Sequence, residues 1–181
     1  MDRDDDKKMM VRIAGGDKKA FEELYESTSK QVFYYLQRLM QSREGAEDVL
    51  IEVYAQVWQN AGNFRGQSRA KTWIFGIARN LALNELRKGG KRTVQCLPET
   101  LGCDRNSQAV DAFERGLHIQ KALSALSLKH REIIDLVFFH DMIYSEIADL
   151  LDISENTVKT RIFYAKSALE EQLRKMENKR R

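Results

Sequence analysis

Proline occurs only once in this chain of 181 residues, and its position divides the sequence into two helix-forming parts. Pro98 lies within residues 89–108, where glycines and polar residues replace any helical spacing of apolar side chains. On either side, over about 12–88 and 112–176, proline is absent and apolar residues recur at helical intervals. The sequence therefore predicts an all-α protein, with small helical domains over 12–88 and 112–178 and a flexible linker over 89–111.

Composition argues against two other classes of protein. With 43% hydrophobic and 31% charged residues, the chain can form a core and is not disordered throughout. It holds no run of about eighteen uncharged apolar residues, the length that a membrane helix needs. No apolar segment of a secretory signal follows the charged start MDRDDDKKMM, so we expect a cytoplasmic protein without membrane insertion of its own. Because this acidic start is either native or an artificial extension, the fold prediction leaves it out.

The cysteines and histidines show no spacing typical of a metal or catalytic site. Cys96 and Cys103 lie in the predicted linker without a CxxC motif, which favours two incidental thiols, with a redox pair as the alternative. His118, His130 and His140 lack cysteine or acidic partners at suitable spacing, and no phosphate-binding glycine loop is present. We therefore predict that the protein is not an enzyme and uses neither a cofactor nor a metal.

Charge is distributed unevenly along the chain. Residues 65–92 carry eight basic residues against one acidic residue, and residues 159–181 carry eight against three. Residues 44–64 carry four acidic residues and no basic one. Two separate basic regions indicate two contacts with a polyanion such as nucleic acid, and the acidic region indicates a different partner. The alternative, solvated charged faces, predicts more interspersed signs.

The first domain is predicted to open with helical segments that precede the acidic region. Asp17 can cap a helix that carries Phe21, Leu24 and Tyr25. A second segment continues at helical spacing and contains Val32, Leu36 and Leu39.

The acidic region has the clearest helical pattern in the chain. Its apolar residues form one continuous stripe, made of Ala46, Val49, Leu50, Val53, Tyr54, Val57 and Trp58. The other side carries Glu47, Asp48, Ile51 and Glu52. Ile51 is apolar but lies off the stripe, so it is either a partner contact or a singly exposed apolar residue, which is common.

A further helix over about 69–88 is predicted to carry a nucleic-acid surface. Its buried side consists of Ala70, Ile74, Ile77, Ala78 and Leu81. A separate stripe along the helix aligns an indole, two amides and a guanidinium with two nearby cations: Trp73, Asn80, Asn84 and Arg87, with Lys71 and Arg79. Amides bond base edges, arginine bonds phosphate or guanine, and an aromatic ring stacks on an unpaired base. The alternative is that Trp73 belongs partly to the core and the amides are solvated.

The second domain is predicted to contain a helix-turn-helix. Ile119, Leu123 and Leu126 open one helix, and Ser127 can cap the next, which buries Ile133, Leu136 and Val137. A short helix with Ile147, Leu150 and Leu151 precedes the tight turn DIS, and Ser154 can cap the last helix. In that helix Val158, Ile162, Ala165 and Leu169 face inward.

The outward face of the last helix has the groups that reading the major groove requires. It combines amides, hydroxyls, aromatic rings and a cation: Asn156, Thr157, Lys159, Thr160, Phe163 and Tyr164. A helical hairpin used only for protein contact would more often show an apolar outer stripe. The sequence therefore favours DNA binding by this face.

Four segments in order resemble the extracytoplasmic function (ECF) class of bacterial sigma factors, the smallest initiation subunits of RNA polymerase. They are DKKAFEELYE, AEDVLIEVYAQVW, KTWIFGIARNLALNELRK and YSEIADLLDISENTVKTRIFYAKSAL. The resemblance covers nearly the whole chain after about residue 12. It implies a first domain like sigma region two and a second like region four, a chain that binds core RNA polymerase and promoter DNA, and regulation by an anti-sigma factor.

The resemblance also implies a role for each predicted surface. Glu47, Asp48, Ile51 and Glu52 would bind the clamp coiled coil of the largest polymerase subunit. The stripe around Trp73 would capture a flipped base of the minus-ten promoter element, and the last helix would read the minus-thirty-five element.

Several positions depart from the family pattern. Ile51 stands where Gln is usual, Ala70 where an aromatic residue is frequent, and Asn84 where Asp is frequent. Ile143 replaces a capping Ser or Thr, which predicts a less satisfied helix start. Asp152 replaces a turn Gly, and Asp tolerates the left-handed backbone better than most residues.

Two other functions remain open at the level of sequence. The first is a helix-turn-helix regulator that binds DNA but never joins polymerase, which leaves the acidic helix and the second basic domain without a role. The second is a helical adaptor that works by protein contacts alone, with its basic faces serving solubility. Phosphate contacts predict that DNA affinity falls steeply as salt rises, whereas the adaptor predicts no difference in the binding of promoter DNA with holoenzyme at any salt concentration.

Overall fold

The computed structural model describes residues 3–88 and 119–178, and within these ranges it consists of helices without any strand. The N-terminal domain contains α1 (Arg3–Ala14), α2 (Lys18–Met40), α3 (Arg43–Asn60), the short 3-10 helix η1 (Ala61–Asn63) and α4 (Ala70–Lys88). The C-terminal domain contains α6 (Leu128–Phe138), α7 (Tyr144–Leu151) and α8 (Glu155–Asn178), and residues 119–124 are also helical. The predicted linker, Cys96, Cys103 and His118 lie outside the described residues. The all-α fold in two helical parts is as predicted.

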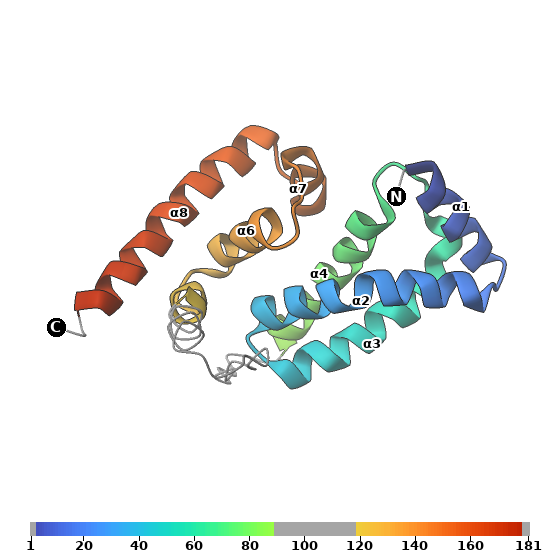
Figure 1. The fold of residues 1–181 in the computed structure, drawn as a ribbon, viewed down its shortest axis with the longest axis horizontal. Coiled ribbons are helices and arrows are strands. Elements are labelled where there is room, and N and C mark those ends of the chain that lie inside the picture. The colour runs from blue at the N-terminus through green and yellow to red at the C-terminus, as the bar shows by residue number, and fades with distance from the viewer. Residues whose placement is uncertain (1–2, 89–118, 179–181) are drawn as a thin grey trace, which may run out of the picture.

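The two parts are arranged side by side (Figure 1). The helices α1 to α4 form one bundle, and α6 and α7 lie between this bundle and the long helix α8. Contacts between the domains run from α2 to α6 and from α4 to α7. Among the helices of the described ranges, none combines the length and apolar character needed to cross a membrane.

The two helical segments predicted at the start of the first domain are one continuous helix of 23 residues, α2. Asp17 caps it as predicted, because its Oδ1 accepts hydrogen bonds from the backbone N–H groups of Lys19 and Ala20. The polar run that separated the two segments in sequence does not break the helix. The hydroxyls of Ser27 and Thr28 donate to the carbonyl oxygen of Leu24, at 3.0 and 2.6 Å, and so are satisfied within it.

The apolar stripes predicted for α3 and α4 form the core of the N-terminal domain. Ala46, Val49, Val53, Tyr54 and Val57 are buried, and Leu50 and Trp58 are half-buried at the edge. On α4 the core receives Ala70, Ile74 and Ala78 as expected, together with Phe75 and Ala82, while Ile77 and Leu81 are half-buried. Tyr35 of α2 and Phe75 of α4 pack against each other with ring centroids 5.0 Å apart. This core fixes the positions of the exposed faces of α3 and α4 relative to each other.

The acidic start that the fold prediction left out is part of the domain. It forms α1, whose Met10 and Ile13 are only 1% exposed within the core. The carboxylate of Asp6 is buried and accepts a hydrogen bond from the backbone N–H of Ala70 at 3.0 Å. Ala70 is the first residue of α4, so Asp6 satisfies an N-terminal donor of that helix and places a negative charge at its positive end. A residue 64 positions away thus caps α4.

Replacing Asp6 by Ala is expected to lower the free energy of unfolding by about 1–2 kcal/mol, the usual cost of losing a helix cap. The buried N–H of Ala70 would lose its acceptor, and α4 would fray at its first turn. Chemical denaturation monitored by circular dichroism measures the difference. Asp5→Ala is the matched control, because Asp5 belongs to the same turn of α1 but is exposed. Equal losses in the two variants would show that Asp6 acts only through α1.

The helices of the C-terminal domain start with largely the capping residues that were predicted. Ser127 caps α6 by accepting from the N–H of His130 at 3.3 Å, and Ser154 accepts from the N–H of Thr157 at 3.2 Å in the first turn of α8. Asp152 takes the left-handed conformation, with φ 53° and ψ 54°, so the turn survives without glycine. Ile143 offers no side-chain cap, but its N–H donates to Glu146 Oε2 at 3.2 Å, which compensates in part for the missing hydroxyl.

Candidate nucleic-acid and protein interfaces

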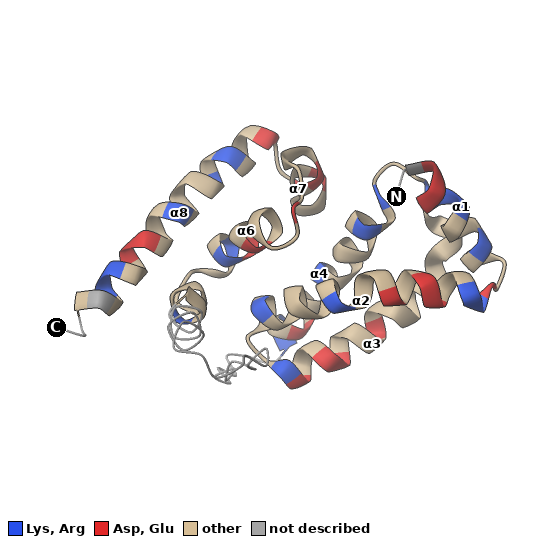
Figure 2. Ribbon diagram, viewed as in Figure 1, with Lys and Arg blue, Asp and Glu red and all other residues tan. Residues whose placement is uncertain are grey.

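The outer face of α8 presents all six residues that the sequence predicted for reading the major groove. We call this set the recognition face: Asn156, Thr157, Lys159, Thr160, Phe163 and Tyr164, all exposed. The opposite side of the helix buries Val158, Ile162 and Ala165, as expected, with Leu169 half-buried. Since α8 projects from the C-terminal domain with basic residues along it (Figure 2), the recognition face is open to a large ligand.

Several side chains of the recognition face are oriented by contacts within α8. Thr157 Oγ1 lies 2.8 Å from Ser154 Oγ, and Thr160 Oγ1 donates to the carbonyl oxygen of Asn156 at 2.9 Å. Phe163 and Tyr164 are 67% and 58% exposed, and their rings meet edge to face with centroids 5.6 Å apart. Neighbouring large rings that are exposed to water are typical of a surface that a partner covers on binding.

The stripe predicted on α4 divides into two parts with different surroundings. Asn80, Asn84 and Arg87 are exposed in the C-terminal half of the helix, and the Arg87 guanidinium donates to Asn84 Oδ1 at 3.4 Å. Trp73 is half-buried, and its ring packs on Phe64 with centroids 5.7 Å apart, in line with the alternative that it belongs partly to the core. One end of the stripe is therefore free to bind, and the other is fixed by packing.

Lys71 and Arg79, the two cations predicted beside this stripe, bind the C-terminal domain in the structure. The Lys71 ammonium donates to the carbonyl oxygen of His140 at 3.1 Å, and Arg79 Nε donates to Glu132 Oε1 at 2.8 Å. Burial lowers the pKa of the Lys71 side chain, because the charged form loses hydration, and the nearby carboxylates of Asp141 and Glu146 partly oppose this. No pattern in the sequence indicated that groups 53 to 69 residues away would bind these cations.

The outer side of α3 is acidic as predicted (Figure 2). Glu47, Asp48, Ile51 and Glu52 are all exposed, and Ile51 is 72% exposed. Among ion pairs between described residues, the acidic face contributes one, between Glu47 and Arg43 one turn earlier, at 2.9 Å. We call these four residues the acidic face of α3. A charged surface with one exposed apolar side chain at its centre suits a basic helical partner that also carries apolar residues.

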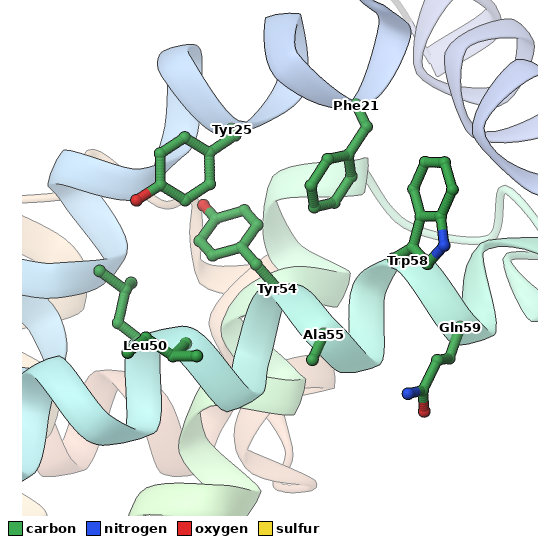
Figure 3. A pocket seen from close by; sticks show the side chains of 8 residues that line it. Phe21, Tyr25, Leu50, Tyr54, Ala55, Trp58 and Gln59 are labelled. Atoms are coloured by element: carbon green, nitrogen blue, oxygen red, sulfur yellow. The ribbon is translucent and has the colours of Figure 1, made fainter. Parts of the chain in front are cut away.

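An apolar groove that the sequence did not predict runs beside the acidic face, between α2 and α3 (Figure 3). It is lined mainly by rings and aliphatic groups: Phe21, Tyr25, Leu50, Ile51, Tyr54, Ala55, Trp58 and Gln59. Phe21 contacts both Tyr54 and Trp58 edge to face, and Tyr25 contacts Tyr54 with centroids 4.6 Å apart. Ile51 lines the groove as well, so its exposed side chain belongs to a continuous apolar surface.

The hydroxyl of Tyr54 anchors the floor of this groove. Burial raises the pKa of Tyr54 to about 12, so the phenol stays protonated near neutral pH. Because the Thr28 hydroxyl donates to Leu24 within α2, the Tyr54 hydroxyl donates to Thr28 Oγ1, which lies 2.7 Å away. The bond links α3 to α2 beneath the groove, and the sequence signal that could have revealed it is the polar Thr28 on the buried side of α2.

The expectation that all three histidines lack an acidic partner is wrong for His140. This residue is buried, and its Nε2 lies 3.1 Å from Asp135 Oδ2 and 3.3 Å from the Arg38 guanidinium. Its ring packs on Phe75 with centroids 4.8 Å apart. Among the described residues, no group of His, Cys, Asp and Glu is arranged to hold a metal ion. The His140 cluster instead joins the two domains.

Comparison with known proteins matches both domains to one family. The model of Sigma-70 region 2 matches residues 24–92, and the model of Sigma-70 region 4 matches residues 117–169. The ECF RNA polymerase sigma factor SigL of Mycobacterium tuberculosis is 31% identical over 166 residues, which cover 88% of this chain and 94% of the relative. The ECF sigma factor SigW of Bacillus subtilis is 29% identical over 182 residues, covering 93% and 96% of the two chains.

Solved structures share the fold over most of the chain. CnrH, solved in complex with the cytosolic domain of CnrY, has a TM-score of 0.72 at 20% identity and covers 93% of this chain and 96% of its own. The sigma factor RpoE of Bartonella quintana, solved in complex with the anti-sigma factor NepR, has a TM-score of 0.71 at 23% identity, covering 86% and 98%. With both sigma regions in order and a curated relative matched along nearly its full length, the chain belongs to the extracytoplasmic function sigma factors, which direct RNA polymerase to promoters in transcription initiation.

Proposed function

We propose that this sigma factor acts in the cytoplasm, carries out no catalysis itself, and divides promoter recognition between its two domains. The observation that carries the proposal is the recognition face of α8. Six side chains able to contact base edges, thymine methyls and phosphates are exposed together on one side of a helix whose other side is buried. In this proposal α7 and α8 form the helix-turn-helix, and α8 enters the major groove of the minus-thirty-five element.

The exposed end of the α4 stripe is proposed to contact the minus-ten element. Asn80 and Asn84 would bond the edges of unpaired bases, and Arg87 would bind phosphate or guanine. Lys71 and Arg79 would add phosphate contacts once the C-terminal domain moves away from them. Trp73 is half-buried against Phe64, so it would offer a ring edge at the base-capture site instead of a free stacking face.

The acidic face of α3 and the apolar groove beside it are proposed to bind core polymerase. The partner that fits is a basic helix of the clamp with an apolar side chain directed at Ile51 and the groove. Ile51 would then replace a polar contact by an apolar one, which explains why this position tolerates an isoleucine on an otherwise charged surface.

An anti-sigma factor is proposed as the regulator of this chain. The support is the shared fold with CnrH and RpoE, of which RpoE was solved in complex with an anti-sigma factor. Its identity would be found by capturing partners with the full chain and testing each for inhibition of transcription.

Transcription by purified core polymerase on a library of random promoter sequences tests the proposed function. We expect polymerase with this chain to select a subset of sequences that share two spaced elements, and polymerase alone to select none. The alternative of a DNA-binding regulator that does not join polymerase predicts no selection and no retention of the chain by polymerase. Retention without sequence selection would contradict the promoter roles of α4 and α8.

Replacing Lys159 by Ala is expected to weaken binding to promoter duplexes almost regardless of sequence. Loss of one phosphate contact should reduce the slope of log affinity against log salt by about 1. Titration of labelled duplex with holoenzyme at several salt concentrations gives this slope. Lys175→Ala is the control, because Lys175 lies on the same helix but pairs with Glu171 at 2.7 Å, away from the recognition face. An unchanged slope for Lys159→Ala would remove this residue from the proposed contact.

A further inference from the structure

The carboxylate of Asp6 contacts the start of α4 in two ways. Its Oδ2 accepts a hydrogen bond from the backbone N–H of Ala70 at 3.0 Å, and the same oxygen lies 4.0 Å from Nε of Arg69. The side chain of Asp6 is 6% exposed, whereas that of Arg69 is 45% exposed. The charge of a buried carboxylate is thus balanced by a helix N-terminus and by a guanidinium at the surface.

The residue before α4 cannot cap this helix in the usual way. A cap accepts hydrogen bonds from the first N–H groups through a side-chain oxygen, and the guanidinium of Arg69 carries donors only. The backbone of Arg69 still starts the first turn, because its carbonyl oxygen accepts from the N–H of Trp73 at 3.1 Å. The acceptor for the N–H of Ala70 comes instead from a different helix, α1.

The position of Asp6 is fixed by the packing of α1. Met10 and Ile13 of this helix are 1% exposed within the core. A Cβ atom at Gly66 would lie 3.4 Å from Cδ of Lys7, so the Lys7 side chain packs over the loop between η1 and α4. In Figure 1 the start of α1 lies beside this loop, and α1 also contacts α4. A carboxylate held in this way can in turn hold the helix that it caps.

The first turn of α4 carries two residues of the proposed minus-ten surface. Lys71 and Trp73 lie one and three positions after Ala70. The ring of Trp73 packs on Phe64 in the preceding loop, with centroids 5.7 Å apart. If the turn unwinds, both Lys71 and Trp73 lose the positions that the helix gives them. The cap and the proposed base-capture site therefore depend on the same turn.

We propose that Asp6 is a positioning residue for promoter opening. From α1 it keeps the first turn of α4 helical, and thereby keeps Lys71 and Trp73 where the minus-ten strand meets them. Asp6 makes no contact with DNA itself, because its carboxylate is buried. This inference rests on the proposed function, which gives α4 the contact with the minus-ten element.

Positioning by Asp6 predicts an effect opposite in sign to that of net charge. Removing a carboxylate raises the net charge of the chain by one, which by itself strengthens binding to DNA. Losing the cap instead raises the fraction of molecules with an unwound first turn, and only the ordered fraction can capture a base. A cap shifts the equilibrium of its turn by about tenfold. We therefore expect promoter opening to become slower, by about fivefold, when the cap is lost.

The test compares holoenzymes that contain Asp6→Ala, Asp6→Asn or the unchanged chain, on a promoter selected from the random library. The fluorescence of a base analogue in the minus-ten element, followed at several holoenzyme concentrations, separates initial promoter binding from opening. We expect Asp6→Ala to keep initial binding within about twofold and to open about fivefold more slowly. Asp6→Asn retains an oxygen that can accept from Ala70, so it should open at most about twofold more slowly.

Two controls separate positioning from net charge and from general stability. Asp5→Ala makes the same change in net charge at an exposed position in the same turn of α1, and it should not slow opening. Ile13→Val removes one buried methyl group of α1, which destabilises the domain to a similar extent but leaves the cap in place. Equal slowing by Ile13→Val and Asp6→Ala would overturn the inference, because a less stable domain would then explain the effect. Unchanged or faster opening in Asp6→Ala would overturn it as well.

A second pair of variants keeps the test decisive if Asp6→Ala does not fold. Arg69→Asn places an ordinary capping residue directly before α4, so the helix gains a local cap. Opening by Asp6→Ala/Arg69→Asn should then match that of Arg69→Asn alone within about twofold, because the acid on α1 is no longer needed. Opening that is about fivefold slower in the double variant would refute the inference.

The variant Asn80→Ala separates this inference from the proposed function, because Asn80 is exposed on α4 away from the cap. Slower opening in Asn80→Ala, with unchanged opening in Asp6→Ala, would leave the minus-ten role of α4 standing and the inference refuted. Unchanged opening in both variants would refute both. The expected result is slower opening in both, with normal binding to a duplex that contains only the minus-thirty-five element.

Discussion

Core RNA polymerase should bind the variant Asp48→Lys/Glu52→Lys at least a hundredfold more weakly than the unchanged chain. The two substitutions place like charges against the basic helix proposed as partner of the acidic face of α3, which costs several kcal/mol, or roughly a factor of 100 or more in affinity. Both residues are exposed and make no ion pair with another described residue, so the fold should be unaffected. Titration of the labelled chain with core polymerase, at low and high salt, measures the loss.

The matched control is Glu170→Lys/Glu171→Lys, which makes the same change in net charge on exposed positions of α8. This variant should keep its affinity for polymerase within a small factor. Comparable weakening of both variants would mean that net charge alone decides association. Undiminished affinity of Asp48→Lys/Glu52→Lys would place the polymerase contact elsewhere than on α3.

Promoter opening by the holoenzyme should fall by about ten- to a hundredfold in the variant Asn80→Ala/Arg87→Ala, since a good contact to a base contributes roughly 1–3 kcal/mol. The bases of the minus-ten element would lose an amide and a guanidinium that are exposed in the C-terminal half of α4. Binding to a duplex that contains only the minus-thirty-five element should not change, because that contact is proposed for α8. Fluorescence of a base analogue placed in the minus-ten element follows opening, and gel shift follows duplex binding.

Glu85→Ala serves as the control for this pair. Glu85 is exposed on the same helix, but the helical rotation places it about 140° from Asn80. Its loss should leave opening nearly unchanged. Equal losses of opening and of minus-thirty-five duplex binding in Asn80→Ala/Arg87→Ala would contradict the division of promoter contacts between α4 and α8.

Local patterns in the sequence predicted the elements that depend on neighbouring residues. The caps Asp17, Ser127 and Ser154 were identified because a cap and the helix that it begins are adjacent in the chain. The apolar stripe of α3 predicted which side faces the core, and the polar side of α8 predicted the recognition face. In each case the side chains of a helix repeat their direction every 3.6 residues. The residues that face the core therefore also identify those that face the solvent.

Long-range contacts were not predictable in the same way. In the sequence, Glu132 and Asp135 are polar residues of an amphipathic helix, and they are buried because the N-terminal domain packs against α6. Lys71 and Arg79 likewise looked like exposed cations, because the sequence does not show that the C-terminal domain contacts them. Helical periodicity describes a helix against its own core and carries no information about which surface of another domain will cover it. His140 gained its acidic partner through the path of the chain after α6, which periodicity also does not describe.

The capping of α4 by Asp6 has a consequence for exchanging parts between related sigma factors. The region 2 match begins at residue 24, whereas the carboxylate that caps α4 lies at residue 6. A chimaera joined at the edge of the matched segment would combine α4 from one parent with α1 from the other. Met10 and Ile13 would then have to fit a foreign core, and the first turn of α4 would depend on a foreign acid. A chimaera should therefore take α1 and α4 from the same parent.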